Sequence, residues 1–405
     1  MRKQPRARDL TSCVSRYGLV HTNMSGDFQS LRLYSGYVGL VTLATLSVYG
    51  GAFGSLPKPK RTGDAKGKGE SDEEDEDSEL LQRLASEDVW LFPVLGSITL
   101  FGLYMAMKYF GKEIINLLMG WYITLAAVAS VSKTFLTIVK RVVGKERWKS
   151  FHQTKVSISN TGSKDVTKFS WRTPTPYLLP FGAIPSILWA TNKSLRKSAL
   201  VNDIIGLSFA HDSISLLHLD SFKSGTILLS GLLLYDVWWV FGTEVMVHVA
   251  TNLDLPVKLL WPKALDITGS KGYMMLGLGD IVIPGTYVAL ALRYDYHRFQ
   301  KGQSNGTFKK PYFYAILFSY FAGLATTMIV MHAFQAAQPA LVYLSPACIM
   351  AFLLTAITRG ELYEAWTWSD DPPKPHDQQG AKDEAKDKDK APLPASPGEA
   401  STGSD

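Results

Sequence analysis

Cysteine is scarce in this chain of 405 residues. It occurs only at Cys13 and Cys348, and two such distant thiols supply neither a disulfide framework nor the thiolate cluster of a structural zinc site. The HExxH motif of zinc hydrolases is missing as well. We therefore expect no metal and no other cofactor.

Charged side chains are missing from long stretches of the chain, although Asp, Glu, Lys and Arg make up 19% of it. A helix needs about 20 mostly apolar residues to cross a hydrocarbon core of about 30 Å. The stretches that approach this length are 33–55, 89–110, 113–138, 175–191, 199–217, 225–250, 272–292, 312–336 and 339–357. We predict an all-α, polytopic membrane protein with about nine transmembrane helices. The bilayer is its expected environment, and no nucleic-acid partner is expected.

The polar segments between these stretches set the predicted domain boundaries. Lys and Arg are about twice as frequent in the loops of one side as in those of the other, and the basic side usually faces the cytosol. The N-terminus is then lumenal, where Asn23 of the sequon "NMS" could be glycosylated. We expect a polar lumenal tail at 1–32, a first transmembrane helix at 33–56, a disordered acidic and basic cytosolic loop at 57–88, helices 2–5 within 89–217 with a cytosolic loop at 139–174, a membrane core of helices 6–9 at 218–360 and a disordered cytosolic tail at 361–405.

Two carboxylates interrupt neighbouring apolar stretches. Asp236 lies in "LLLYDVWWVFG" and Asp280 in "MLGLGDIVIPG". A carboxylate at a helix centre costs about 2.5–3.5 kcal/mol on insertion scales, so it is seldom kept without a use. Each lies about 20 Å along its helix from a flanking basic residue of the cytosolic side, Lys223 or Arg293, so antiparallel helices would place both acids at one level. Two such groups cannot both ionise, and they would share a proton as an aspartic protease pair does.

Small residues and a proline accompany these acids. Gly277 and Gly279 directly precede Asp280, and glycine in a helix interior costs about 1 kcal/mol relative to alanine. A position without a side chain allows another backbone to approach closely, although a helix-packing seam would use the same residues. Pro339 should prevent a regular helix at the start of the last span, leaving backbone groups for protein or cavity water to satisfy.

Other polar side chains also fall within or near the spans. A hydrogen-bonded position inside the helix bundle is expected for Asp203, His211, Asp212 and His218, and an interfacial position for Glu244 and His248.

These residues carry a family resemblance. Tyr235-Asp236, Gly277-Leu278-Gly279-Asp280 and Pro339-Ala340-Leu341 resemble, in this order, the YD, GxGD and PAL motifs of the intramembrane aspartyl proteases. The flanking text is similar to the signal peptide peptidase branch of that family. The resemblance implies that Asp236 and Asp280 are the catalytic pair and that 218–360 is the catalytic core. It also implies an active site shaped by Tyr235, Gly277, Leu278, Gly279, Gln338, Pro339, Ala340 and Leu341.

The same resemblance implies a substrate class and a location. Substrates would be remnant signal peptides and other type II oriented membrane helices, cut within the bilayer of the endoplasmic reticulum, with the N-terminus lumenal and the C-terminus cytosolic. Assembly into a homo-oligomer stays open.

Two other functions could use intramembrane carboxylates. The first is a proton-coupled transporter or channel. The second is an adaptor for degradation in the endoplasmic reticulum that binds membrane helices without cutting them. The chain shows no internal repeat, and it pairs the GxGD motif with PAL, so the protease is favoured.

Overall fold

The computed structural model describes residues 35–57, 82–84, 89–159, 166–192, 194–243, 245–253, 255–256, 258–262, 273–302, 308–334 and 338–370. Several predictions concern residues outside these ranges, namely the polar tail at 1–32 with Cys13 and the sequon at Asn23, the acidic part of the loop at 57–88, Glu244, and the tail beyond residue 370. The chain divides into two compact units, Met1–Trp368 and Ser369–Asp405, and the description below concerns the first.

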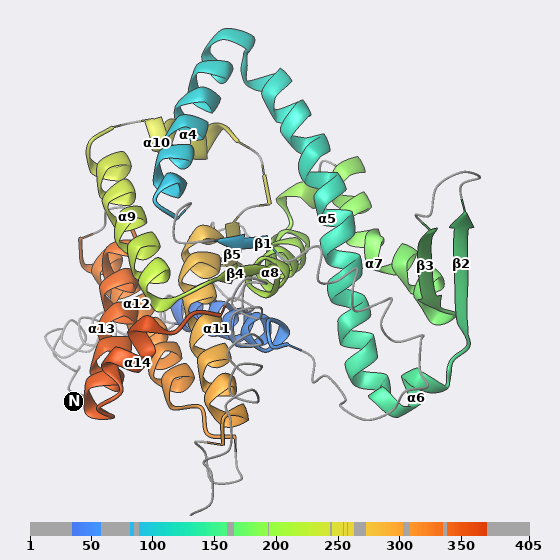
Figure 1. Cartoon of the computed structure of the whole chain (residues 1–405). Coiled ribbons are helices and arrows are strands. Elements are labelled where there is room, and N and C mark those ends of the chain that lie inside the picture. The colour runs from blue at the N-terminus through green and yellow to red at the C-terminus, as the bar shows by residue number, and fades with distance from the viewer. Residues whose placement is uncertain are drawn as a thin grey trace, which may run out of the picture. The chain divides into compact units, whose positions relative to one another are not determined.

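The elements of this unit are mostly helical (Figure 1). An unlabelled helix at Ser35–Gly54 is followed by α4 (Leu91–Phe110), α5 (Lys112–Val143), α6 (Lys145–Ser150), α7 (Pro174–Thr191), α8 (Ala199–Leu216), α9 (Phe222–Phe241), α10 (Val245–Asn252), α11 (Gly279–Gln300), α12 (Pro311–Phe334), α13 (Leu341–Thr358) and α14 (Leu362–Thr367). The strands are β1 (Gln82–Leu84), β2 (Gln153–Ser159), β3 (Val166–Arg172), β4 (Leu217–Leu219), β5 (Lys258–Pro262) and β6 (Tyr273–Gly277). They form three two-stranded sheets, β1 with β4 in parallel, and β2 with β3 and β5 with β6 antiparallel.

The predicted fold class is confirmed. Six of the described helices are long and apolar enough to cross a membrane: Ser35–Gly54, α4, α5, α9, α12 and α13. The helices α7, α8 and α11 form where spans were expected, but they are not among these six, so the number nine stays a prediction. Large apolar side chains such as Trp121 and Leu125 are exposed along α5, as expected of a face that meets lipid.

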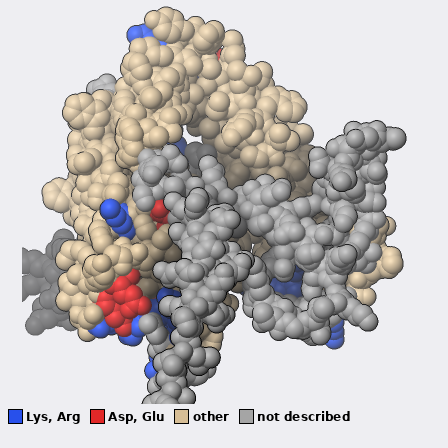
Figure 2. All heavy atoms as spheres, viewed as in Figure 1, with Lys and Arg blue, Asp and Glu red and all other residues tan. Residues whose placement is uncertain are grey.

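Charged groups are distributed unevenly over the described surface. In the view of Figure 2 most of that surface carries neither Lys and Arg nor Asp and Glu, and charged side chains lie in its lower part, at mid-height on the left and at its upper tip. Large areas without charged side chains are expected where a protein surface meets lipid.

Two of the predicted spans have wrong boundaries. The span expected at 225–250 ends as helix α9 at Phe241, and a separate short helix, α10, follows. Glycine at 242 is a poor helix former, and the Thr243 side chain bonds back to the Trp239 carbonyl oxygen at 3.1 Å, which competes with continuation of the backbone ladder.

The span expected at 272–292 begins as a strand. Residues Tyr273–Gly277 form β6, and helix α11 starts only at Gly279. Burial alternates along β6, since Met274 and Leu276 are buried whereas Met275 is 59% exposed. This period of two is typical of a strand with one buried face. A short apolar run can form either a helix or a strand, and here the pairing with β5 makes it a strand.

The predicted cytosolic loop at 139–174 contains regular secondary structure. It contains the end of α5, helix α6 and the β2–β3 hairpin, whose register pairs Gln153 with Arg172 and Ser159 with Val166.

Helix α11 is at the centre of the largest core cluster. Residues Val288 to Leu292 are fully buried, because α8, α9, α12 and α13 all pack against this helix (Figure 1). The packing against α9 is close: a Cβ added at Gly225 would lie 2.6 Å from the Tyr287 ring. A helix covered on all sides is positioned rigidly, and it carries Asp280 in its first turn.

Candidate active site

Asp236 lies in the C-terminal part of α9. Its side chain is 7% exposed. The helix is well defined at its other end, where the Ser221 hydroxyl accepts a hydrogen bond from the Ser224 backbone N–H at 3.2 Å, an ordinary N-cap. The carboxylate is therefore held on a rigid, apolar helix rather than on a loop.

Asp280 is the second residue of α11 and is partly buried. The helix expected at 272–292 would have Asp280 near its middle. This prediction is wrong, because residues Tyr273–Gly277 form β6 and the helix begins only at Gly279. The real position of Asp280 in the first turn has an electrostatic consequence. The free N–H groups and the dipole of a helix N-terminus favour a carboxylate at that end.

The structure brings the two acids together. Asp236 and Asp280 interact electrostatically, although they come from different helices and enter the site from different ends of those helices. Two carboxylates in one desolvated site share a proton rather than ionise together. The arrangement thus supplies one group that can take a proton and one that can donate a proton.

The third motif joins the same site. The Leu341 backbone N–H lies near the Asp236 carboxylate and interacts with it favourably. Helix α13 begins at Leu341, Ala340 is its N-cap residue and Pro339 lies outside the helix. The prediction that Pro339 prevents regular helix at this point is confirmed, and the N–H that is freed at the helix start lies near an acid of the pair.

The glycines of the GxGD motif surround Asp280 in different ways. A Cβ added at Gly277 would lie 3.3 Å from Oδ2 of Asp280, whereas a Cβ at Gly279 would meet nothing within 4 Å. Leu278, between them, points toward α8, because a Cβ at Gly206 would lie 3.2 Å from its Cδ1. Gly277 therefore leaves room for the Asp280 carboxylate, and Gly279 borders free space.

The remaining predicted residues lie around this centre. Tyr235 faces α4, since a Cβ at Gly96 would lie 3.5 Å from its ring, and it contacts Trp239 with ring centroids 6.3 Å apart. Gln338 is partly buried just before Pro339. Their roles in shaping the site stay predictions.

A small sheet that the sequence did not indicate leads into the site. Strand β6 ends at Gly277, immediately before the start of α11, and pairs with β5. Asp203 on α8 holds β5 in place, because its Oδ1 accepts a hydrogen bond from the Leu260 backbone N–H at 2.7 Å. Asp203 was expected to have a polar partner in the bundle, but nothing in the sequence indicated that the partner is a strand.

The other polar residues do not form a second centre. The Thr134 hydroxyl donates to Asp212 at 3.4 Å, within the bundle as expected. Among the described residues no group of three His, Cys, Asp or Glu side chains could hold a metal ion.

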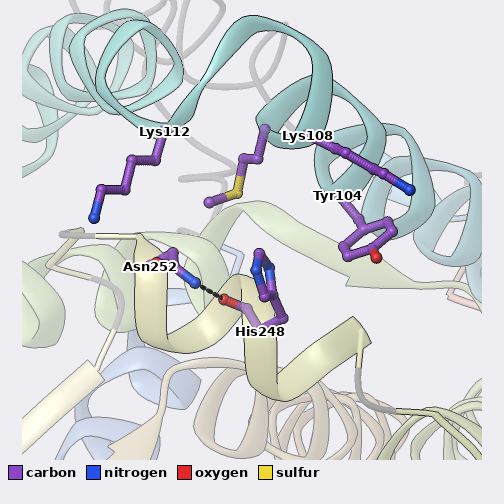
Figure 3. A pocket seen from close by; sticks show the side chains of 6 residues that line it. Tyr104, Lys108, Lys112, His248 and Asn252 are labelled. Carbon is purple, nitrogen blue, oxygen red and sulfur yellow. Dashed lines mark hydrogen bonds between the residues drawn. The ribbon is translucent and has the colours of Figure 1, made fainter.

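His248 lines a cavity of about 400 Å³ together with Tyr104, Met107, Lys108, Lys112 and Asn252 (Figure 3). The Asn252 side chain donates to the His248 carbonyl oxygen at 2.8 Å. The cavity lies between the end of α4, the start of α5 and α10, and neither acid of the pair lines it. We therefore locate the chemistry at the acids rather than in this cavity.

Paired acids on neighbouring helices of a membrane protein, with a backbone N–H near one of them, are the arrangement of an intramembrane aspartyl protease. The family model described as signal peptide peptidase matches residues 75–372. Human signal peptide peptidase is 34% identical over 84% of this chain and 84% of its own length. Mouse signal peptide peptidase is likewise 34% identical over 84% of this chain and 84% of its own length. Intramembrane protease 2 of Caenorhabditis elegans is 45% identical over 44% of this chain and 39% of its own length.

The chain belongs to the signal peptide peptidase family. It is a multi-pass membrane protein and an aspartyl protease that cleaves within the membrane. Of the three functions left open by the sequence, the protease is the one that the comparisons show.

Proposed function

We propose that Asp236 and Asp280 are the catalytic pair, and that the chain hydrolyses remnant signal peptides and other type II oriented membrane helices within the membrane of the endoplasmic reticulum. The observation that supports this proposal is the convergence of three motifs, since Asp236 interacts with Asp280 and lies near the Leu341 N–H.

The reaction uses water as the nucleophile. One carboxylate takes a proton from the water, whose oxygen attacks the carbonyl carbon of the scissile amide, while the other carboxyl gives its proton to the carbonyl oxygen. The resulting tetrahedral diol then loses one hydroxyl proton to a carboxylate. The C–N bond breaks, and the amine leaves with a proton from the pair. The pair is restored, and no cofactor is consumed.

Substrate must reach this pair in an extended form, because a helix hides each amide in an i to i−4 hydrogen bond. In lipid each freed backbone group costs several kcal/mol unless it finds a partner. Strand β6 ends beside Asp280, and the open space at Gly279 adjoins it. An unwound substrate segment that adds as a strand at this place would satisfy its backbone groups.

The proposal is tested by replacing each acid. In purified protein reconstituted into bilayers, Asp236→Asn and Asp280→Asn should each lower the cleavage rate of a type II membrane peptide by at least about 100-fold, since each proton transfer has its own donor or acceptor. Asp212→Asn is the matched control, because Asp212 is also a buried acid on a helix of the bundle. Full cleavage by either pair variant would refute the assignment.

Location and orientation need a separate measurement. We expect Asn23 to be glycosylated in microsomes, as shown by a mass shift that Asn23→Gln abolishes. A C-terminal tag should be digested by protease added outside the microsomes. A protected C-terminal tag would reverse the proposed orientation.

A further inference from the structure

The cavity at the C-terminal end of α4 carries two positive charges. It lies where α4 ends, α5 begins and α10 packs beside α4 (Figure 1). Its volume of about 400 Å³ has room for a small ligand or the end of a peptide. The lining residues include Lys108 and Lys112 but no acid, and Glu113, which follows Lys112 in the chain, does not line the cavity. These walls favour an anion.

The two lysines face each other across a wall that is held in place. In the view of Figure 3 their side chains lie on opposite sides of the cavity, and neither forms an ion pair within the part of the chain that the structure describes. Between them, the Asn252 side chain donates to the His248 carbonyl oxygen at 2.8 Å. The Asn116 side chain donates to the Asn252 carbonyl oxygen at 2.9 Å and ties α10 to α5. The cavity is thus bounded by fixed helices.

Helices α4 and α9 lead from the acid pair to this cavity. A Cβ added at Gly231 of α9 would lie 2.9 Å from Pro93 of α4, and further along both helices the Trp239 indole donates to the Ser97 hydroxyl at 3.1 Å. Contacts that advance together show that the two helices run in the same direction. Beyond these contacts α4 continues to the cavity, and α9 is followed by α10, which lines it.

The distance between the acids and the cavity follows from α4. Its Gly96 lies opposite Tyr235, the neighbour of Asp236, since a Cβ at Gly96 would lie 3.5 Å from the Tyr235 ring. Lys108 follows twelve residues later on the same helix, about 18 Å along the axis. An extended peptide covers about 3.3 Å per residue. A segment of about five to six extended residues therefore joins the two levels.

We propose that this cavity binds the C-terminal carboxylate of a remnant signal peptide. Such a peptide has been cut from its precursor, so it ends in a free carboxylate, and in the type II orientation that end is lumenal. The predicted orientation places the connection between α4 and α5 on the same side. The ammonium groups of Lys108 and Lys112 hold the carboxylate by charge-assisted hydrogen bonds. This inference rests on the proposed function and orientation.

The test uses two synthetic membrane peptides that differ only in their last group, a free acid or its amide, about five to six residues beyond the scissile bond. Cleavage by the purified full-length protein in phosphatidylcholine bilayers gives KM for each. We expect the wild-type KM to be about threefold to tenfold lower for the acid, the effect of two solvated ion pairs. Lys108→Gln combined with Lys112→Gln should bring the two KM values together. Added salt should reduce the wild-type difference as well.

Lys301→Gln is the matched control. Lys301 is also an exposed lysine, but it lies at the end of α11 and does not line the cavity. This variant should keep the wild-type preference for the acid. An undiminished preference in the double lysine variant would overturn the inference.

Peptide length provides a second measurement. The preference for the acid should be greatest when the carboxylate lies about five to six residues beyond the scissile bond. It should disappear when a long polar segment separates the two. An equal preference at both lengths would show that the terminal charge acts elsewhere, and the inference would be wrong.

A phospholipid phosphate carries a similar charge, and the same experiment distinguishes it. A KM that rises equally for both peptides in the double variant, and that varies with added anionic lipid, would identify a headgroup site and overturn the inference. Equal wild-type KM values for acid and amide would remove the carboxylate site but leave the protease assignment intact. Failure of the wild-type protein to cut either peptide would instead contradict the proposed function.

Discussion

The backbone N–H of Leu341 lies beside the carboxylate of Asp236 and interacts with it favourably. Leu341 is the first residue of α13, and Asp236 lies on α9. The first N–H groups of a helix have no partner within the helix, so a chain that starts a helix beside an acid supplies that acid with an aligned donor. The proline and alanine before Leu341 set this helix start.

This relationship predicts a specific effect of proline at 341. Leu341→Pro removes the N–H that lies beside Asp236, and we expect cleavage to fall by about tenfold or more, because a favourable interaction with a charged group is lost. Val342→Pro is the control, since it also puts proline into the first turn but leaves the Leu341 N–H in place. Leu341→Val keeps the N–H and should stay active. Equal rates for the two proline variants, measured at equal protein levels, would contradict the prediction.

The two glycines of the GxGD motif should respond differently to alanine. A Cβ at Gly277 would lie 3.3 Å from Oδ2 of Asp280, whereas a Cβ at Gly279 has free space. We expect Gly277→Ala to displace the carboxylate and reduce kcat strongly, and Gly279→Ala to stay largely active. Gly279→Leu should block substrate approach and suppress cleavage. The kcat values of the three variants test this prediction. Equal activity of Gly279→Leu and Gly279→Ala would show that Gly279 is not needed for substrate approach.

Asp203 should matter through the sheet rather than through proton transfer. Asp203→Ala leaves the partly buried Leu260 N–H without its acceptor, and an unsatisfied donor costs up to about 1–3 kcal/mol when it is buried. We expect a lower melting temperature and slower cleavage, because β5 supports β6 and β6 leads into Asp280. Asp203→Asn retains an acceptor oxygen and should be close to wild type. A loss of activity in Asp203→Asn as large as in Asp280→Asn would indicate a direct chemical role instead.

Substrates with weak helices should be cut faster. A membrane peptide with Gly, Pro, Ser or Asn in mid-span unwinds at lower cost than a uniform leucine helix of equal length, because its intrahelical hydrogen bonds are already weakened. Initial cleavage rates of such a pair can be compared in one bilayer composition, with binding measured separately. Unwinding would not be limiting if the leucine peptide bound as well and was cut as fast.

Much of this protein was predictable because the signals are local. Hydropathy is a property of each stretch by itself, so the class of membrane protein and the approximate positions of the helices follow from the sequence. Asp236 and Asp280 could be singled out for the same reason, since a carboxylate in an apolar stretch is costly wherever the rest of the chain lies. The irregular start of the last helix at Pro339 is likewise dictated by one residue.

The remaining features depend on partners far away in the sequence. Residues 273–277 form a strand only because β5 pairs with them, and an apolar run of that length is compatible with either a strand or a helix. Asp203 anchors β5 through a backbone N–H. Packing between distant segments decides these contacts, and packing is a relation that no single stretch of sequence contains.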